Sequence, residues 1–209
     1  MISCHHPYSP AELWADGIIH ALGVLFAIGA VIFLFSHMAG LSQGASLAVY
    51  GFGLAGMLGA SAAYNMWRGP AREWLRRVDH AMIYVMIAGS YTPFVVLRLS
   101  GDAATLLGSV VWTGAAVGVL LKVFLPRRFE RLSLALYLGL GWALVLGFEP
   151  LVDSLAGSTL AFLVAGGILY TLGVPLHLAR RLRFHNAAWH ACVLAAAICH
   201  FVAITGEFV

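Results

Sequence analysis

The chain has 209 residues, of which 61% are hydrophobic and 10% are charged, and its formal net charge is +3. Soluble globular domains carry about 25% charged residues, so this composition excludes a soluble enzyme and predicts a multi-pass protein of the inner (plasma) membrane. The basic residues lie beside apolar segments, which makes them a topology signal and excludes a nucleic-acid footprint.

Seven apolar runs are long enough to cross the hydrocarbon core as helices, a crossing that needs roughly 20 residues. The expected spans cover residues 17–37, 45–66, 79–97, 104–124, 132–148, 159–179 and 188–206. The breaks between them are too short for a second domain, so the predicted fold is one all-α, seven-transmembrane helix bundle. The first ten residues contain no Lys or Arg, and we therefore expect no signal peptide.

Lys and Arg fall almost entirely in alternate connections. Eleven of the twelve basic residues lie between spans two and three, four and five, or six and seven, and only Arg98 lies in the other set. Short cytoplasmic loops carry the excess of positive charge, so the amino terminus is predicted in the cytoplasm and the carboxyl terminus outside. The only lysine, Lys122, lies near the end of the fourth span. A retinal Schiff base in the seventh span is therefore excluded.

Small residues and cysteines suggest how the spans pack. Gly114 and Gly118 form a GxxxG pair, which favours close helix packing within the chain over a dimer face. Cys192 and Cys199 lie seven residues apart in one apolar run, and Cys4 lies near the amino terminus. We therefore expect reduced packing residues rather than a disulfide framework.

Polar side chains gather at the cytoplasmic ends of four expected spans. They are Glu12, Asp16 and His20 near the first span, Ser61 and Asn65 in the second, Asp79 and His80 in the third, and His185, Asn186 and His190 in the seventh. Charged groups in a membrane cost about 2.5–3.5 kcal/mol, so this gathering indicates a functional pocket. Zinc prefers imidazole and carboxylate ligands and can activate a water as a nucleophile. The carboxylates near the first span have an alternative role, because acidic groups stabilise the first turn of a helix.

Four separated motifs carry a family resemblance: YSPAELWADGIIH, SAAYN, LRRVDHAMIYVMIAGSYTPF and HNAAWHACVLAAAICHF. Together they resemble the bacterial hemolysin III branch of the progestin and adipoQ receptor superfamily, from about Tyr8 to Ile204. The resemblance implies a seven-helix bundle with a cytoplasmic amino terminus and a zinc site near the cytoplasmic face. It also implies that Asp79 and His190 are metal ligands and that Ser61 belongs to the same site, and Ser61 is therefore a catalytic candidate.

The ligand positions depart from the family pattern in two places. Asn65 and Asn186 stand where the family has His, and an amide is a poorer zinc ligand than an imidazole, so weakened zinc binding is expected. His185 could substitute only if the seventh helix begins later or is distorted, because a shift of one residue turns a side chain by about 100°. Asp16 stands where family members carry Asn, and its carboxylate is a second catalytic candidate. Further pocket candidates are Glu12, His20 and His80.

The resemblance leaves different classes of function open. The first is a zinc-dependent hydrolase that cleaves an amide or ester bond of a membrane lipid, as eukaryotic relatives are thought to do. The second is a non-enzymatic regulator of membrane state or ion homeostasis with a degraded metal site. Pore-forming hemolysis is a disfavoured third function, because a multi-span chain with this topology signal is typical of a protein resident in its own membrane. The expected partner is membrane lipid.

Overall fold

A computed structural model describes residues 8–209, which fold into helices with no strand among them. The long helices are α1 (Pro10–Ser36), α2 (Leu41–Met66), α3 (Arg72–Leu97), α4 (Gly101–Phe124), α7 (Gly157–Leu178) and α8 (His185–Phe208). Between α4 and α7 lie α5 (Glu130–Gly141), the 3-10 helix η1 (Ala143–Gly147) and the short α6 (Phe148–Ser154). Within the described residues, six helices are long and apolar enough to span a membrane.

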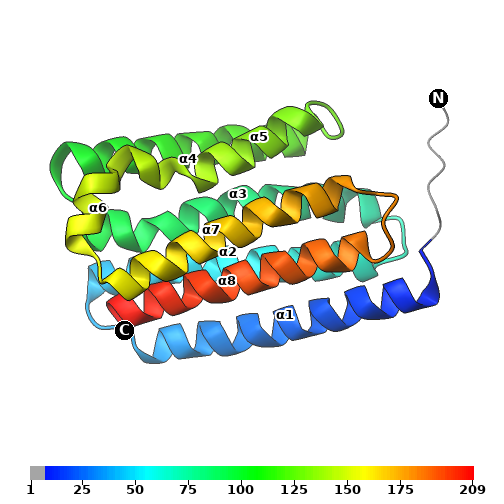
Figure 1. Ribbon diagram of the computed structural model, residues 1–209, viewed down its shortest axis with the longest axis horizontal. Helices are drawn as coiled ribbons and strands as arrows, with labels where there is room; N and C mark the ends of the chain where they lie inside the picture. The colour runs from blue at the N-terminus through cyan, green and yellow to red at the C-terminus, as the bar shows by residue number, and fades with distance from the viewer. Residues whose placement is uncertain (1–7) are drawn as a thin grey trace.

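The long helices run side by side in one bundle (Figure 1). α1 packs on α2 and α8, α3 packs on α2 and α4, α7 packs on α8, and α5 packs on α3 and α4. The α2–α3, α4–α5 and α7–α8 connections lie at the end where α1 begins, and the carboxyl terminus lies at the opposite end (Figure 1). We call the first end the basic end, because these connections and the adjoining helix ends carry every Lys and Arg except Arg98.

The outer surface of the bundle is apolar. On α1 alone, seven large apolar side chains are more than half exposed: Trp14, Ile18, Leu22, Leu25, Ile28, Ile32 and Phe35. Contiguous exposed apolar surface of this kind is typical of contact with lipid. Trp14, Trp67 and Trp74 are exposed at the basic end, and tryptophan favours the membrane–water interface. The chain is therefore built as a multi-pass membrane protein.

Glycines bring the central helices into close contact. A Cβ on Gly53 of α2 would lie 3.1 Å from the Cα of Met86 in α3, and a Cβ on Gly118 of α4 would overlap the ring of Tyr84. Gly114 likewise faces Leu140 of α5. The GxxxG pair thus serves packing within the chain, as the sequence predicts.

The fifth apolar run differs from its prediction. One continuous span is expected over residues 132–148, whereas α5 ends at Gly141 and the chain turns at Trp142 before continuing as η1. Gly139 and Gly141 weaken the helix here, since each glycine costs about 1 kcal/mol relative to alanine. At 1.5 and 2.0 Å per residue, α5 and η1 together extend about 28 Å, close to the thickness of the hydrocarbon core. A seventh crossing by this broken segment stays a prediction.

The other six expected spans coincide with the six long helices, but several helices begin earlier than expected. Both α1 and α3 start seven residues before the predicted boundary. Polar residues in the first two turns hide the start of a span from a hydropathy reading. As a consequence, Asp79 lies two turns inside α3 rather than at its beginning.

The end opposite the basic end is held by a polar clamp around Glu207 of α8. Its carboxylate pairs with Arg98 at 2.7 Å and accepts hydrogen bonds from Thr159 Oγ1 at 2.7 Å and from the backbone N–H of Ala156 at 3.3 Å. The clamp joins the ends of α3 and α8 to the start of α7. It explains why one arginine lies away from the basic end.

The cysteines agree with the prediction where they are described. Cys192 and Cys199 of α8 are free thiols. The prediction for Cys4 falls outside the described residues.

Candidate metal centre

A capping box at the start of α1 fixes Glu12. Ser9 donates to Glu12 Oε2 from its backbone N at 2.8 Å and from its Oγ at 2.7 Å, and Glu12 N donates to Ser9 Oγ at 3.3 Å. Glu12 Oε1 accepts a hydrogen bond at 3.0 Å from the backbone N of Phe184, which has the left-handed φ of 59° that precedes α8. Glu12 therefore caps α1 and ties the start of α8 to it, which confirms the first-turn interpretation of this residue.

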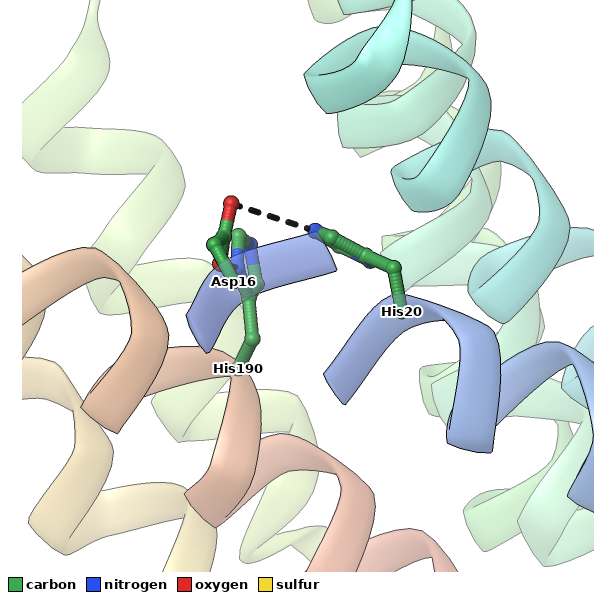
Figure 2. A group of neighbouring side chains, drawn as sticks. All are labelled: Asp16, His20 and His190. Atoms are coloured by element: carbon green, nitrogen blue, oxygen red, sulfur yellow. Dashed lines mark hydrogen bonds and ion pairs between the residues drawn. The ribbon is translucent and has the colours of Figure 1, made fainter. Parts of the chain in front are cut away.

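Three residues with metal-ligand side chains meet between α1 and α8 (Figure 2). Asp16 and His20 begin the buried face of α1, and His190 lies in the second turn of α8. Asp16 Oδ1 is 2.6 Å from His190 Nδ1, and Asp16 Oδ2 is 3.6 Å from His20 Nε2. One ligand-type atom from each residue lies within 4.8 Å of the other two. We call Asp16, His20 and His190 the triad.

The two asparagines at the positions where the resemblance predicts histidine ligands behave differently. Asn186 Nδ2 donates to Asp16 Oδ2 at 3.0 Å, so it orients the carboxylate of the triad. Asn65 Nδ2 instead donates to the carbonyl of Ser61, one turn back on its own helix, at 3.0 Å. Of the two, only Asn186 touches the triad.

Asp79 and Ser61 face the triad from α3 and α2. Asp79 is buried with Ser61 beside its carboxylate, and the Asp79 carboxylate is close enough to His20 for an electrostatic interaction. Both residues line the same cavity as His20 and His190. Asp79 nevertheless lies outside the group whose ligand atoms fall within 4.8 Å of one another. The structure thus places Asp79 next to the triad and not within it.

His185 and His80 line the cavity without joining the triad. His185 is the first residue of α8, and its Nε2 lies 3.4 Å from the hydroxyl of Tyr8. Burial is the main cause that raises the pKa of the Tyr8 phenol above its usual value, so Tyr8 is neutral near pH 7. His80 Nδ1 lies 3.4 Å from a guanidinium nitrogen of Arg76.

The polar group opens on a cavity of about 1180 Å³. Its wall on α3 runs from Arg72 to Phe94, which is about 33 Å along the helix axis. The rest of its length is walled mainly by apolar residues of α5, α7 and α8. α5 packs on α3 and α4, whereas α7 packs on α8. The two sides meet where Trp142, the residue after α5, donates from Nε1 to Thr171 Oγ1 of α7 at 3.0 Å. The length of the α3 wall is close to the thickness of the hydrocarbon core, so the cavity extends over most of the depth of a membrane.

The triad has the donors that a zinc ion needs. Two imidazoles and a carboxylate form a common catalytic zinc set, and zinc–ligand bonds of about 2.0–2.1 Å place tetrahedral ligand atoms roughly 3.3 Å apart. The separations of 2.6 and 3.6 Å lie on either side of that value. His20 Nε2 is buried and has no hydrogen-bond partner among residues 8–209, and a metal ion would satisfy it. The residues present fit the ion.

The sequence singled out each member of the triad but divided their roles differently. It placed the metal on Asp79 and His190, by resemblance, and left His20 as a further pocket candidate. The signal for the triad was the i, i+4 spacing of Asp16 and His20, which puts both side chains on one face of α1. Which face meets α8 depends on the packing of the bundle.

The fold and the site define a multi-pass helical membrane protein with a buried His/His/Asp group at one end of its bundle. The family model described as haemolysin-III related matches residues 12–201, so the chain belongs to the haemolysin III family. It is similar to "Hemolysin-3 homolog" of Bacillus subtilis (strain 168), with 33% identity over 196 residues that cover 91% of each chain.

Two further relatives extend the comparison. "Hemolysin-3" of Bacillus cereus is 32% identical over 196 residues, covering 91% of this chain and 89% of the relative. "Monocyte to macrophage differentiation factor" of Homo sapiens is 31% identical over 169 residues, covering 75% of this chain and 67% of the relative. These matches confirm the family resemblance drawn from the four motifs.

Proposed function

We propose that this protein is a zinc-dependent hydrolase that cleaves an amide or ester bond of a membrane lipid. The observation that carries the proposal is the convergence of Asp16, His20 and His190 within 4.8 Å, beside a cavity long enough to hold an acyl chain. The proposal includes seven membrane crossings, with α5 and η1 as the fifth, and a basic end that faces the cytoplasm. The excess of Arg at that end supports this orientation.

The triad would hold the metal, and Asn186 would keep the Asp16 carboxylate in place through its hydrogen bond. When bound, zinc would supply a Lewis acid and lower the pKa of a water toward 7. His190 would need to give up its present contact with Asp16, because a hydrogen-bonded separation of 2.6 Å is shorter than two ligands of one ion require.

Asp79 is the group best placed to take a proton. It lies on the cavity wall near His20, with Ser61 beside its carboxylate. In the proposed reaction Asp79 removes a proton from the attacking water, whose oxygen bonds to the acyl carbon while the C–N or C–O bond breaks. The same proton then passes to the leaving group. The apolar part of the cavity would hold the acyl chain and exclude other water.

Asp79→Asn tests this role. The variant is expected to keep its zinc but to release oleic acid at least about 100-fold more slowly from an 18:1 amide or ester lipid, because a positioned general base contributes 100-fold or more. Release is measured by mass spectrometry with purified protein in lipid nanodiscs. Asp102→Asn, which removes an exposed carboxylate at the start of α4, serves as the control and should leave the rate unchanged. A zinc-loaded protein that releases oleic acid from neither lipid contradicts the proposal.

One observation favours the non-enzymatic function as a second candidate. The Asp16 carboxylate already accepts a hydrogen bond from Asn186 and contacts His190, so much of the polar group is satisfied without a metal. In that case the group would serve as a structural network in a regulator of membrane state. A regulator predicts no product release, together with altered membrane fluidity or ion balance in cells that lack the protein.

A further inference from the structure

Seven cationic side chains line the basic end of the cavity. They are Arg72, Arg76, Lys122, Arg127, Arg131, Arg180 and Arg181, and the carboxylates on the same wall are Asp79 and Glu130. Orientation in a membrane requires basic residues at this end but does not require them to line a cavity. Four others at the same end lie outside its wall: Arg68, Arg77, Arg128 and Arg183.

Three of the lining cations share two nearby carboxylates. Glu73 pairs with Arg76 at 3.0 Å and with Arg127 at 2.8 Å. Glu130 pairs with Lys122 at 2.9 Å and with Arg76 at 3.4 Å. This network joins α3, α4 and α5 around the mouth of the cavity, and its two carboxylates compensate most of the charge of the three cations.

The other four lining cations have no carboxylate partner in the part of the chain that the structure describes. Among residues 8–209, no ion pair includes Arg72, Arg131, Arg180 or Arg181, and residues 1–7 contain no Asp or Glu. They come from α3, α5 and the α7–α8 connection, so they reach the mouth from different sides. The mouth therefore carries excess positive charge directly above an apolar cavity.

We propose that the basic end of the cavity binds the phosphate of a lipid headgroup while the acyl chain of that lipid lies in the apolar part. The guanidinium group of arginine matches phosphate oxygens with paired, charge-assisted hydrogen bonds. A ligand that complements both regions must be anionic at one end and apolar along the rest of its length. The inference rests on the proposed function and names its substrate class as a phosphate-bearing lipid.

The positions along α3 agree with this binding mode. Asp79 lies two turns beyond Arg72, which is about 10 Å deeper along the helix axis. A phosphate held by Arg72, Arg180 and Arg181 would therefore place the first bonds of the acyl chain beside Asp79 and His190. Those are the bonds that a hydrolase at the triad would reach.

The test compares two lipids with one acyl chain and different headgroups. Metal-stripped protein in a neutral detergent is titrated with 18:1 lysophosphatidic acid or with uncharged monooleoylglycerol, and bound lipid is counted by native mass spectrometry. The phosphate lipid is expected to bind at least about tenfold more tightly. Arg180→Gln combined with Arg181→Gln should weaken its binding on the order of tenfold. Arg128→Gln combined with Arg183→Gln removes the same charge from the same end outside the cavity wall and should leave binding unchanged.

Three outcomes would overturn the inference. Equal binding of the two lipids would show that only the apolar cavity matters. Equal weakening by the two double variants would reduce the effect to general surface charge. Inorganic phosphate that binds at the same arginines as tightly as the lipid would make this a free-phosphate site. Because the protein carries no metal in this assay, the lipid-binding result does not depend on whether the zinc proposal is correct. The zinc content of both double variants, measured separately, distinguishes a failure of phosphate binding from a failure of the metal site.

Discussion

Replacing Asp16 with alanine is expected to raise the dissociation constant for zinc by at least about 100-fold, the upper range seen even for residues that only orient metal ligands. The substitution removes the one carboxylate that faces both imidazoles, at 2.6 Å from His190 and 3.6 Å from His20. It also takes away the acceptor of the Asn186 amide. The constant is measured by competition with a zinc-chelating dye in detergent.

Glu12→Ala provides the matched control for this prediction. Glu12 lies one turn before Asp16 on the same helix and also contacts the start of α8, but its carboxylate caps helices. Its loss should lower thermal stability and leave zinc affinity within about threefold of the unaltered protein, because the ligand set is untouched. If both substitutions lower the affinity for zinc equally, the loss in Asp16→Ala comes from misalignment of the starts of α1 and α8. The triad would then not be a metal site.

Gly118→Ala is expected to destabilise the bundle by about 2 kcal/mol. A Cβ at this position of α4 overlaps the ring of Tyr84, which is fully buried and held by a hydrogen bond of 3.3 Å from its hydroxyl to the carbonyl of Ser133. The ring cannot move away without breaking the contact between α3 and α5. Thermal unfolding in detergent, followed by the far-ultraviolet helix signal, measures the loss.

The control for the glycine substitution is Gly59→Ala in α2. Nothing lies within 4 Å of a Cβ added at Gly59. The only expected effect is the higher helix propensity of alanine, a gain of up to about 1 kcal/mol. The two substitutions should therefore have opposite signs. A Gly118→Ala protein as stable as the unaltered one would mean that α3 and α4 are not in the contact described here.

The helices could be predicted because a membrane span is encoded locally. About 20 apolar residues and a polar break suffice, and the six long helices follow that rule. The interruption after Gly141 escaped prediction because the apolar run continues through Trp142, Ala143 and Leu144. Hydropathy reports whether residues can lie in lipid and says nothing about whether they form one regular helix.

The site was predicted in outline, because polar residues at one depth on several helices must meet when those helices pack. Their individual contacts were beyond the sequence. Asn65 turns back to Ser61 and Asn186 reaches Asp16, although the resemblance predicts a metal ligand at both positions. Such choices depend on helix rotation and on side-chain rotamers set by neighbours far apart in the chain.

The assignment of the metal to the triad is tested by the zinc content of purified protein, measured by elemental analysis for the unaltered chain, His20→Ala, Asp79→Ala and His37→Ala. His20 belongs to the triad but not to the ligands that the resemblance predicts, and His37 at the other end of α1 controls for the loss of an imidazole. We expect one zinc per chain in the unaltered protein, in Asp79→Ala and in His37→Ala, and none in His20→Ala. Zinc that survives His20→Ala but is lost in Asp79→Ala, or a chain that never takes up zinc, would contradict this assignment.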